Sequence, residues 1–338
     1  MLKKRVITIV SCLIMLIVSL YVFERANEIL IRKTSRNRME DLIQGETNKD
    51  ILFMGTSHIM DGVIPIELWE EYGYTSYILC SEYNDMDRYV PMLRLALQYT
   101  KPKLVVLDVD NYWEKSPADN VLNGYHDYAD AFPLTKEKVK TTCELYQDEE
   151  IRRELLFPIV RYHERWKDLS RGDFRKHGSD GYLKGYEFST EMQEVELYPV
   201  VGREEGILYD SYGLSAMEKL IALCKEEGIE VLLMTTPFNA DTQEQQFLQG
   251  MHQFADAQGV SYVNLIEENM LDPTADYRDD GHLNVFGAQK VTAFMGNYIS
   301  ERYDIPDRSE DTFYKEKWNG DYQEYLAFVT EQIENSEG

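Results

Sequence analysis

The sequence predicts an α/β protein with a parallel sheet of about five strands, covered by helices on both faces and preceded by one transmembrane helix. Two observations predict the sheet. Short apolar runs alternate with helix-length segments, and these runs are apolar throughout rather than at every second residue. A third observation, the uncharged apolar stretch from Val6 to Phe23, predicts the transmembrane helix. The 338 residues suffice for one large domain with an insertion or for two small domains.

The apolar stretch at the N-terminus is expected to be an uncleaved anchor. It approaches the roughly 20 residues that a helix needs to cross a bilayer, and it ends in Leu20–Phe23 without the small residues of a signal-peptidase site. Residues 1–25 are therefore interpreted as cytoplasmic tail and anchor, and residues 26–49 as a juxtamembrane stem. Basic residues lie on both sides of the anchor, and the expected orientation keeps the amino tail inside and the domain outside.

Three strands and two helices are expected between residues 50 and 109. Pro65 suits the first turn of one of these helices, because its fixed backbone angle matches the helix and its missing N–H is not needed there. In chain order, the expected elements are the strand Asp50–Thr56, the helix Pro65–Tyr72, the strand Ser76–Cys80, the helix Asp85–Tyr99 and the strand Lys103–Val109.

The alternation resumes at Ser211. Gly228 and Gly259 follow two expected helices, where glycine is favoured because it readily adopts the left-handed conformation that ends a helix. The expected elements are the helix Ser211–Glu227, the strand Ile229–Thr235, the helix Asp241–Gln258, the strand Val260–Leu265 and the helix Val285–Tyr303. The order of the five strands in the sheet is left open.

Two segments lie outside this pattern. Residues 112–210 are aromatic and charged and too numerous for a bare loop, so we expect a partly helical lid or subdomain beside the site. Residues 306–338 form an acidic tail whose aromatic side chains suit a docked helix with a frayed end.

Composition excludes some functions. The formal net charge is −25, and a protein this acidic lacks the basic surface that nucleic acid requires. Cys12 lies in the anchor, and the other three cysteines form an odd, widely spaced set that predicts no disulfide framework. No metal and no cofactor are expected, because His126, His163, His177 and His252 show no ligand spacing.

The candidate catalytic residues are Ser57, Asp279 and His282. The first strand ends in a glycine turn, Gly55-Thr56-Ser57, that presents Ser57, and the last block reads Asp279-Asp280-Gly281-His282. Serine, histidine and acid supply the nucleophile, base and orienting group of acyl transfer. A single helical turn would bring Asp279 and His282 to one side, whereas Asp280 should point elsewhere. His58 is expected to point away from Ser57.

The candidate oxyanion donors also follow strands. They are the Ser57 amide and the Asn111 side chain, with a backbone amide at Ser81 or its neighbour as a further donor. Asp108 and Asp110 lie on one face by alternation and allow a metal-binding Asp-x-Asp interpretation, but no basic diphosphate cradle accompanies them. We therefore favour a structural role for Asp108 at the end of the sheet.

At these residues the chain resembles the SGNH/GDSL hydrolase superfamily of three-layer α/β/α esterases and acyltransferases. Gly55-Thr56-Ser57 is similar to the first block of its membrane-anchored branch, Asp279-x-x-His282 matches the last block, and Asn111 lies where the third block's asparagine is expected. The resemblance spans residues 50–303 without the insertion, within an expected domain of residues 50–305. The second block departs from it, because Leu79-Cys80-Ser81 replaces the usual glycine.

The resemblance to the teichoic acid D-alanylation and alginate acetylation proteins implies a serine O-acyltransferase or esterase that acts on an acylated cell-surface polysaccharide through a Ser57 ester. The implied partners are the polysaccharide, the membrane and a membrane-bound O-acyltransferase. Two alternatives stay open: a plain carbohydrate esterase, and a catalytically weak binding or scaffolding subunit of an acylation complex.

Overall fold

The computed structural model describes residues 2–32, 39–81, 83–171, 173–174 and 180–336. The chain divides into two compact units. One unit joins residues 1–37 with 129–179, and the other joins residues 38–128 with 180–338. The predicted stem includes residues 33–38, which lie outside the described residues.

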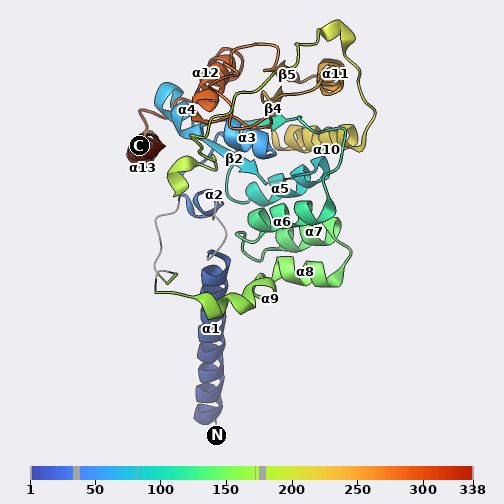
Figure 1. Ribbon diagram of the computed structural model, residues 1–338. Coiled ribbons are helices and arrows are strands. Elements are labelled where there is room, and N and C mark those ends of the chain that lie inside the picture. Colours follow the sequence, from blue (N-terminus) through green and yellow to red (C-terminus); the bar gives the residue numbers. More distant parts are fainter. Residues whose placement is uncertain (1, 33–38, 82, 172, 175–179, 337–338) are drawn as a thin grey trace. The chain divides into compact units, whose positions relative to one another are not determined.

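The larger unit contains a five-stranded parallel sheet in the order β2-β1-β3-β4-β5 (Figure 1). The fold class predicted from the sequence is confirmed. The strand order, which the sequence left open, reverses direction at β1, because the chain first moves outward to β2 and then back across to β3. Ligands of such open sheets bind beyond the carboxyl ends of the strands at this switch point. The strands are β1 (Ile51–Gly55), β2 (Ser76–Cys80), β3 (Leu104–Asp108), β4 (Glu230–Thr235) and β5 (Ser261–Asn264).

Helices cover both faces of this sheet. Phe53 of β1 and Val106 of β3 belong to a core shared with one set of helices: α3 (Ser57–Gly62), α4 (Pro65–Tyr72), α12 (Val285–Arg302) and α13 (Thr312–Ser336). The other face carries α5 (Tyr89–Ala96), α10 (Tyr212–Glu227) and α11 (Thr242–Gln258) (Figure 1). All five residues of β1, β2 and β3 are buried, as expected for strands covered on both faces.

Most predicted elements occur at their predicted places. The predicted bounds of α4 and β2 agree with the structure to the residue. The helix predicted over Asp85–Tyr99 is shorter, since it begins with a 3-10 turn at Met86–Arg88 and α5 ends at Ala96. The sequence was interpreted as a turn where the structure has α3, a helix too short to show an apolar repeat.

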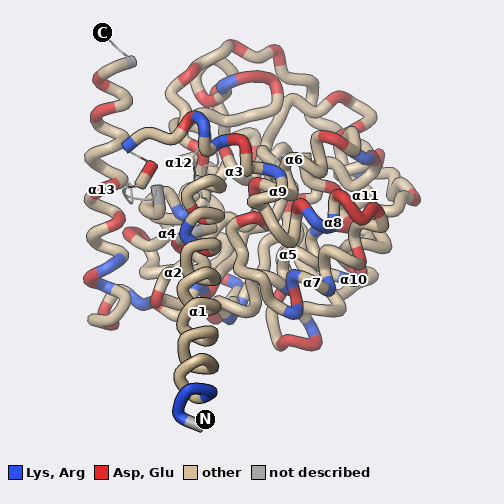
Figure 2. The backbone as a smooth tube through the Cα atoms, turned by 90° about the horizontal axis from the view of Figure 1, so that it is seen from below, with Lys and Arg blue, Asp and Glu red and all other residues tan. Residues whose placement is uncertain are grey.

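The smaller unit contains α1 (Leu2–Arg32), whose span Lys3–Ile31 is apolar and long enough to cross a membrane. In Figure 2 a basic N-terminal turn is followed by a long section of α1 that carries no charge. Tyr162 packs against Leu30 and Ile31, and Arg165 donates to the Leu30 carbonyl at 2.8 Å. Residues 129–179 contribute the end of α6 (Ala118–Ala129), α7 (Lys136–Leu145), α8 (Glu149–Leu156), α9 (Ile159–Tyr162) and a 3-10 helix at His163–Asp168.

The rest of the predicted insertion belongs to the larger unit. It contains short 3-10 helices at Asp180–Leu183 and Arg203–Glu205, and residues 187–202 run without helix or strand. This segment is attached by backbone hydrogen bonds, among them Glu187 N–H to the Met60 carbonyl at 3.0 Å and Gln193 N–H to the Tyr277 carbonyl at 2.9 Å. It therefore connects α3 with the segment that carries Asp279 and His282.

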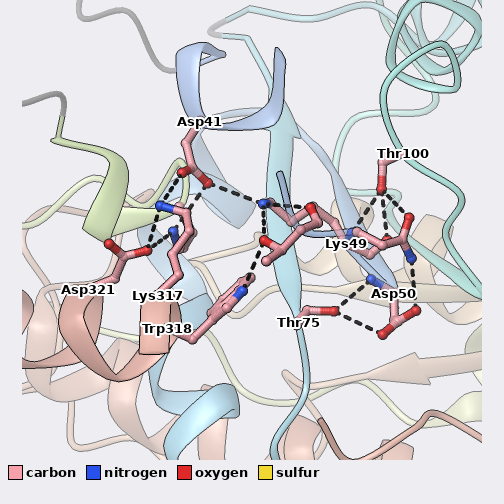
Figure 3. A network of polar contacts seen from close by, with 11 residues as sticks. Asp41, Lys49, Asp50, Thr75, Thr100, Lys317, Trp318 and Asp321 are labelled. Atoms are coloured by element: carbon pink, nitrogen blue, oxygen red, sulfur yellow. Dashed lines mark hydrogen bonds and ion pairs between the residues drawn. The ribbon is translucent and has the colours of Figure 1, made fainter. Parts of the chain in front are cut away.

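A buried polar network attaches α13 to the start of β1 (Figure 3). The Asp41 carboxylate, in α2 (Glu40–Gln44), pairs with Lys49 at 3.3 Å, Lys184 at 3.2 Å and Lys317 at 3.0 Å. Asp321 pairs with Lys184 and Lys317. Five charged groups of α2, α13 and two loops thus meet in one place, where each buried ammonium has a carboxylate partner.

Candidate active site

Ser57 lies at the start of α3, directly after β1. Thr56 is the N-cap of this helix, and its hydroxyl accepts from the His58 amide at 3.4 Å. Gly55 ends β1 where the backbone passes close to β3, so the chain turns sharply between strand and helix. The turn places the Ser57 side chain at the carboxyl edge of the sheet, beside the switch point.

Ser57, His282 and Asp279 form one hydrogen-bonded chain. His282 Nε2 lies 2.8 Å from Ser57 Oγ, across a sequence separation of 225 residues, and His282 Nδ1 lies 2.8 Å from Asp279 Oδ1. A carboxylate can only accept, so Nδ1 carries the proton toward Asp279 and Nε2 accepts from the Ser57 hydroxyl. The structure brings together all three residues that the sequence analysis paired.

The route by which Asp279 reaches His282 differs from the prediction. The segment is not a helical turn. Tyr277 and Leu283 form an isolated antiparallel bridge, and Asp279 Oδ1 accepts from the Gly281 amide at 2.9 Å. The residues on either side of this segment pair with each other, so the chain reverses its direction in a short turn. The Asp279 side chain closes the turn through its hydrogen bond to the Gly281 amide. Asp280 points elsewhere, as predicted, with its Oδ1 toward Asn239 at 3.4 Å.

The surroundings favour a neutral His282 and an ionised Asp279. Burial lowers the pKa of His282, and the nearby His58 and Arg278 lower it further, against the opposing effect of Asp279. Burial opposes ionisation of Asp279, but hydrogen bonds from His282 and the Gly281 amide hold its pKa below the usual value. A neutral imidazole is the form that can take a proton from serine.

Two residues that the sequence analysis did not select support this arrangement. Arg278 contacts Asp279 Oδ2 through Nε at 3.3 Å and the buried Asp61 through its other end at 2.9 Å. Asp61 lies on α3, four residues after Ser57. The salt bridge therefore ties the helix that carries Ser57 to the loop that carries His282. Ser57 and Asp61 are four residues apart, and in a helix this spacing places both side chains on one face. This spacing was the sequence signal that could have identified Asp61.

The predicted oxyanion donors lie at the ends of the strands that flank β1. Ser81 follows β2 and is buried, and Asn111 follows β3. Ser81 Oγ and the buried Asn111 Oδ1 have no hydrogen-bond partner among the residues that the structure describes. Both therefore lie at the same sheet edge as Ser57. No hydrogen bond joins either of them to Ser57 within the described part of the chain, and their role stays a prediction.

Asp108 and Asp110 form polar contacts at the end of the sheet. Asp108 accepts from the Thr236 hydroxyl and amide, and burial together with Asp110 raises its pKa to about 7. Asp110 accepts from the Thr56 hydroxyl at 2.8 Å and lies 3.0 Å from His58. Among the described residues, no group of three or more metal-ligating side chains includes them.

Close packing around position 55 leaves no room for a side chain larger than that of glycine. A Cβ at this position would lie 2.8 Å from Asp108 Cβ and 2.8 Å from Ile59 Cγ2. We expect Gly55→Ala to lower the free energy of unfolding by about 1–3 kcal/mol, because the core must shift to admit the methyl group. Gly320→Ala is the matched control, since nothing lies within 4 Å of its added Cβ. Equal melting temperatures for Gly55→Ala and the parent protein would contradict this expectation.

No protein-family model matches the chain, and no curated protein matches it. Among solved structures, it is similar to a GDSL-like lipase from Bacteroides thetaiotaomicron, with 13% identity, a TM-score of 0.36, and coverage of 75% of this chain and 88% of that one. It is also similar to an acetyl xylan esterase from the rumen bacterium Butyrivibrio proteoclasticus, with 11% identity, a TM-score of 0.31, and coverage of 76% and 65%.

Proposed function

We propose that this protein is a serine esterase or O-acyltransferase that acts on an acyl ester of a cell-surface polysaccharide through a Ser57 acyl-enzyme. The observation that carries this proposal is the pair of 2.8 Å contacts that joins Ser57 to His282 and His282 to Asp279. Hydroxyl, imidazole and carboxylate in this order are the arrangement by which serine hydrolases of unrelated folds activate their nucleophile.

In the first half-reaction, Ser57 Oγ attacks the ester carbonyl while His282 Nε2 takes the hydroxyl proton. Asp279 holds the ring and stabilises the imidazolium that forms. The carbonyl oxygen becomes negative, and the Ser57 amide, the Asn111 amide group and an amide near Ser81 are the candidate donors, each contributing about 3 kcal/mol. The C–O bond to the leaving alcohol then breaks, and His282 returns its proton to that alcohol.

In the second half-reaction, an incoming hydroxyl attacks the Ser57 ester. His282 removes its proton, the bond to Ser57 Oγ breaks, and the proton returns to Ser57. If water attacks, the ester is hydrolysed, and if a sugar hydroxyl attacks, the acyl group is transferred. Both outcomes use the same three residues, so the acceptor that reaches the site decides between esterase and transferase.

The placement at the cell surface is part of the proposal. The apolar helix α1 supports a single membrane anchor, and the basic residues that precede its apolar run favour an amino tail inside and the larger unit outside. A polysaccharide of the cell envelope would then be within reach. A membrane-bound O-acyltransferase that delivers the acyl group is the partner we propose.

A serine-reactive phosphonate probe tests the proposal. We expect the probe to label the full-length protein at Ser57 and the label to disappear in His282→Ala, because the hydroxyl is unreactive without its base. Ser300→Ala is the matched control, since this serine lies exposed on α12 and should not affect labelling. Absence of label at Ser57, together with full polymer acylation by Ser57→Ala, would select the scaffolding alternative.

A further inference from the structure

A second acid–histidine pair lies beside the candidate active site. His58 follows Ser57 on α3, and its Nδ1 lies 3.0 Å from Oδ2 of the buried Asp110, which follows β3. The Thr56 hydroxyl donates to the same Asp110 oxygen at 2.8 Å. The residues on either side of Ser57 are thus both held by one carboxylate.

The other edge of the His58 ring faces the base of the proposed triad. The His58 and His282 rings lie 5.3 Å apart, edge to face, and Phe238 packs on His58 with ring centroids 4.8 Å apart. His58 Nε2 lies 3.4 Å from the point that a Cβ on Gly281 would occupy, in the turn between Asp279 and His282. Asp110 therefore holds one nitrogen of the ring, and the other nitrogen is directed at the loop that carries His282.

The charges around His58 favour its protonated form. Burial alone would lower the pKa of His58, but Asp110, and more weakly Asp108 and Asp61, outweigh it and raise the pKa above the usual value. Asp61 is already paired with Arg278. The titratable groups that face His58 from the elements packed around it are Asp110 and Asp108 at the end of β3, Asp61 on α3, Glu244 on α11, and Asp279 and His282 in the turn.

We propose that His58, held by Asp110, is a positioning residue whose imidazolium keeps His282 unprotonated and able to act as a base in mildly acidic medium. Two like charges about 5 Å apart in a partly buried site repel each other, so the protonated form of His282 is disfavoured while His58 is charged. The inference rests on the proposed function and gives a role to a residue outside the triad.

The pH dependence of hydrolysis tests this inference. The rate kcat/KM of the full-length protein in detergent micelles is measured between pH 4.5 and 8 with p-nitrophenyl acetate. The acid limb of the pH–rate profile is the range in which kcat/KM falls as the base becomes protonated. We expect His58→Gln to shift this limb to higher pH by roughly half to one unit, because the repulsion that lowers the pKa of His282 is gone. Asp110→Asn should move it in the same direction, since His58 then loses its proton more easily. The two variants provide independent tests if one of them folds poorly.

The matched control is His252→Gln. His252 also pairs with a carboxylate, Glu267 at 3.2 Å, but on α11 and away from the triad, so its loss should leave the limb unchanged. A merely structural role for His58 would lower the rate at every pH without moving the limb, and that result would overturn the inference, as would a downward shift.

A second readout does not depend on activity. The chain has six histidines, and ¹³C-labelled imidazoles allow each to be titrated by NMR. The pKa of His282 should rise in His58→Gln by the same amount as the acid limb, and an unchanged pKa would refute the coupling. If the parent protein neither hydrolyses esters nor reacts with the phosphonate, the proposed function fails, whereas the NMR titration still decides the coupling between the two rings.

Discussion

Replacing Ser57 by alanine is expected to lower kcat/KM for a small ester by about 10³-fold or more. The variant lacks the oxygen that attacks the carbonyl, so only the binding and oxyanion contributions remain. Steady-state hydrolysis of p-nitrophenyl acetate by the full-length protein measures the effect. His282→Ala should produce a loss of the same order, because the hydroxyl 2.8 Å from its Nε2 then has no base.

The double variant Ser57→Ala/His282→Ala distinguishes a catalytic unit from two independent contributions. Residues that act in one proton transfer are strongly non-additive, so the double variant should be no slower than the slower single variant. Ser300→Ala, an exposed serine on α12, should retain the parent rate. Full activity in Ser57→Ala would refute the acyl-enzyme, and a multiplied loss in the double variant would contradict a shared step.

Asp41→Asn is expected to lower the free energy of unfolding by about 3–5 kcal/mol. The change removes the carboxylate that pairs with Lys49, Lys184 and Lys317 (Figure 3). Lys184 and Lys317 keep Asp321, but the buried Lys49 ammonium loses its carboxylate, and breaking a buried pair on one side is strongly destabilising. Urea unfolding of the full-length protein measures the loss. Asp256→Asn, on the exposed face of α11, is the control and should change stability by less than about 0.5 kcal/mol.

The same network predicts a pH dependence of stability. Burial would raise the pKa of Asp41, but Lys184 and Lys49 hold it well below its usual range. The stabilisation from Asp41 is therefore complete above about pH 4 and is lost as the pH falls further. Burial lowers the pKa of Lys49 to about 8. The buried charge of Lys49 therefore destabilises the folded state below pH 8, and this destabilisation declines as the pH rises toward the pKa of Lys49 in the unfolded chain. In Asp41→Asn, the free energy of unfolding should therefore fall less steeply as the pH is lowered.

Much of the fold follows from local signals in the chain. The bounds of α4 agree with the prediction, and the residues at its two ends explain them: Pro65 begins the helix, and Gly73, with a φ of 66°, ends it. β2 contains the apolar run Tyr77–Cys80, which marks it in the sequence. α3 was missed because its six residues are stabilised by the Thr56 cap and by packing around Gly55 rather than by a repeating apolar face.

The site was predictable in part for the same reason. Ser57 and His282 each carry a local motif, and their order along an α/β pattern paired them despite a separation of 225 residues. Asp110 belongs to an Asp-x-Asp pattern that does not point to His58, and Arg278 carries no motif. Their partners, His58 and Asp61, lie on α3, far away in the sequence, so only the folded chain brings them together.

The sequence by itself determined the α/β class, the positions of five strands, the apolar N-terminal helix and the three residues of the proposed triad, because these depend on periodicity and on residue type within short windows. The tertiary structure decided the strand order β2-β1-β3-β4-β5, the turn that directs Asp279 to His282, and the pairing of His58 with Asp110. The strand order and the His58–Asp110 pair depend on contacts between segments far apart in the sequence, and such contacts produce no repeating pattern of residue types. The turn is local, but it depends on hydrogen bonds within a segment that has no regular repeat.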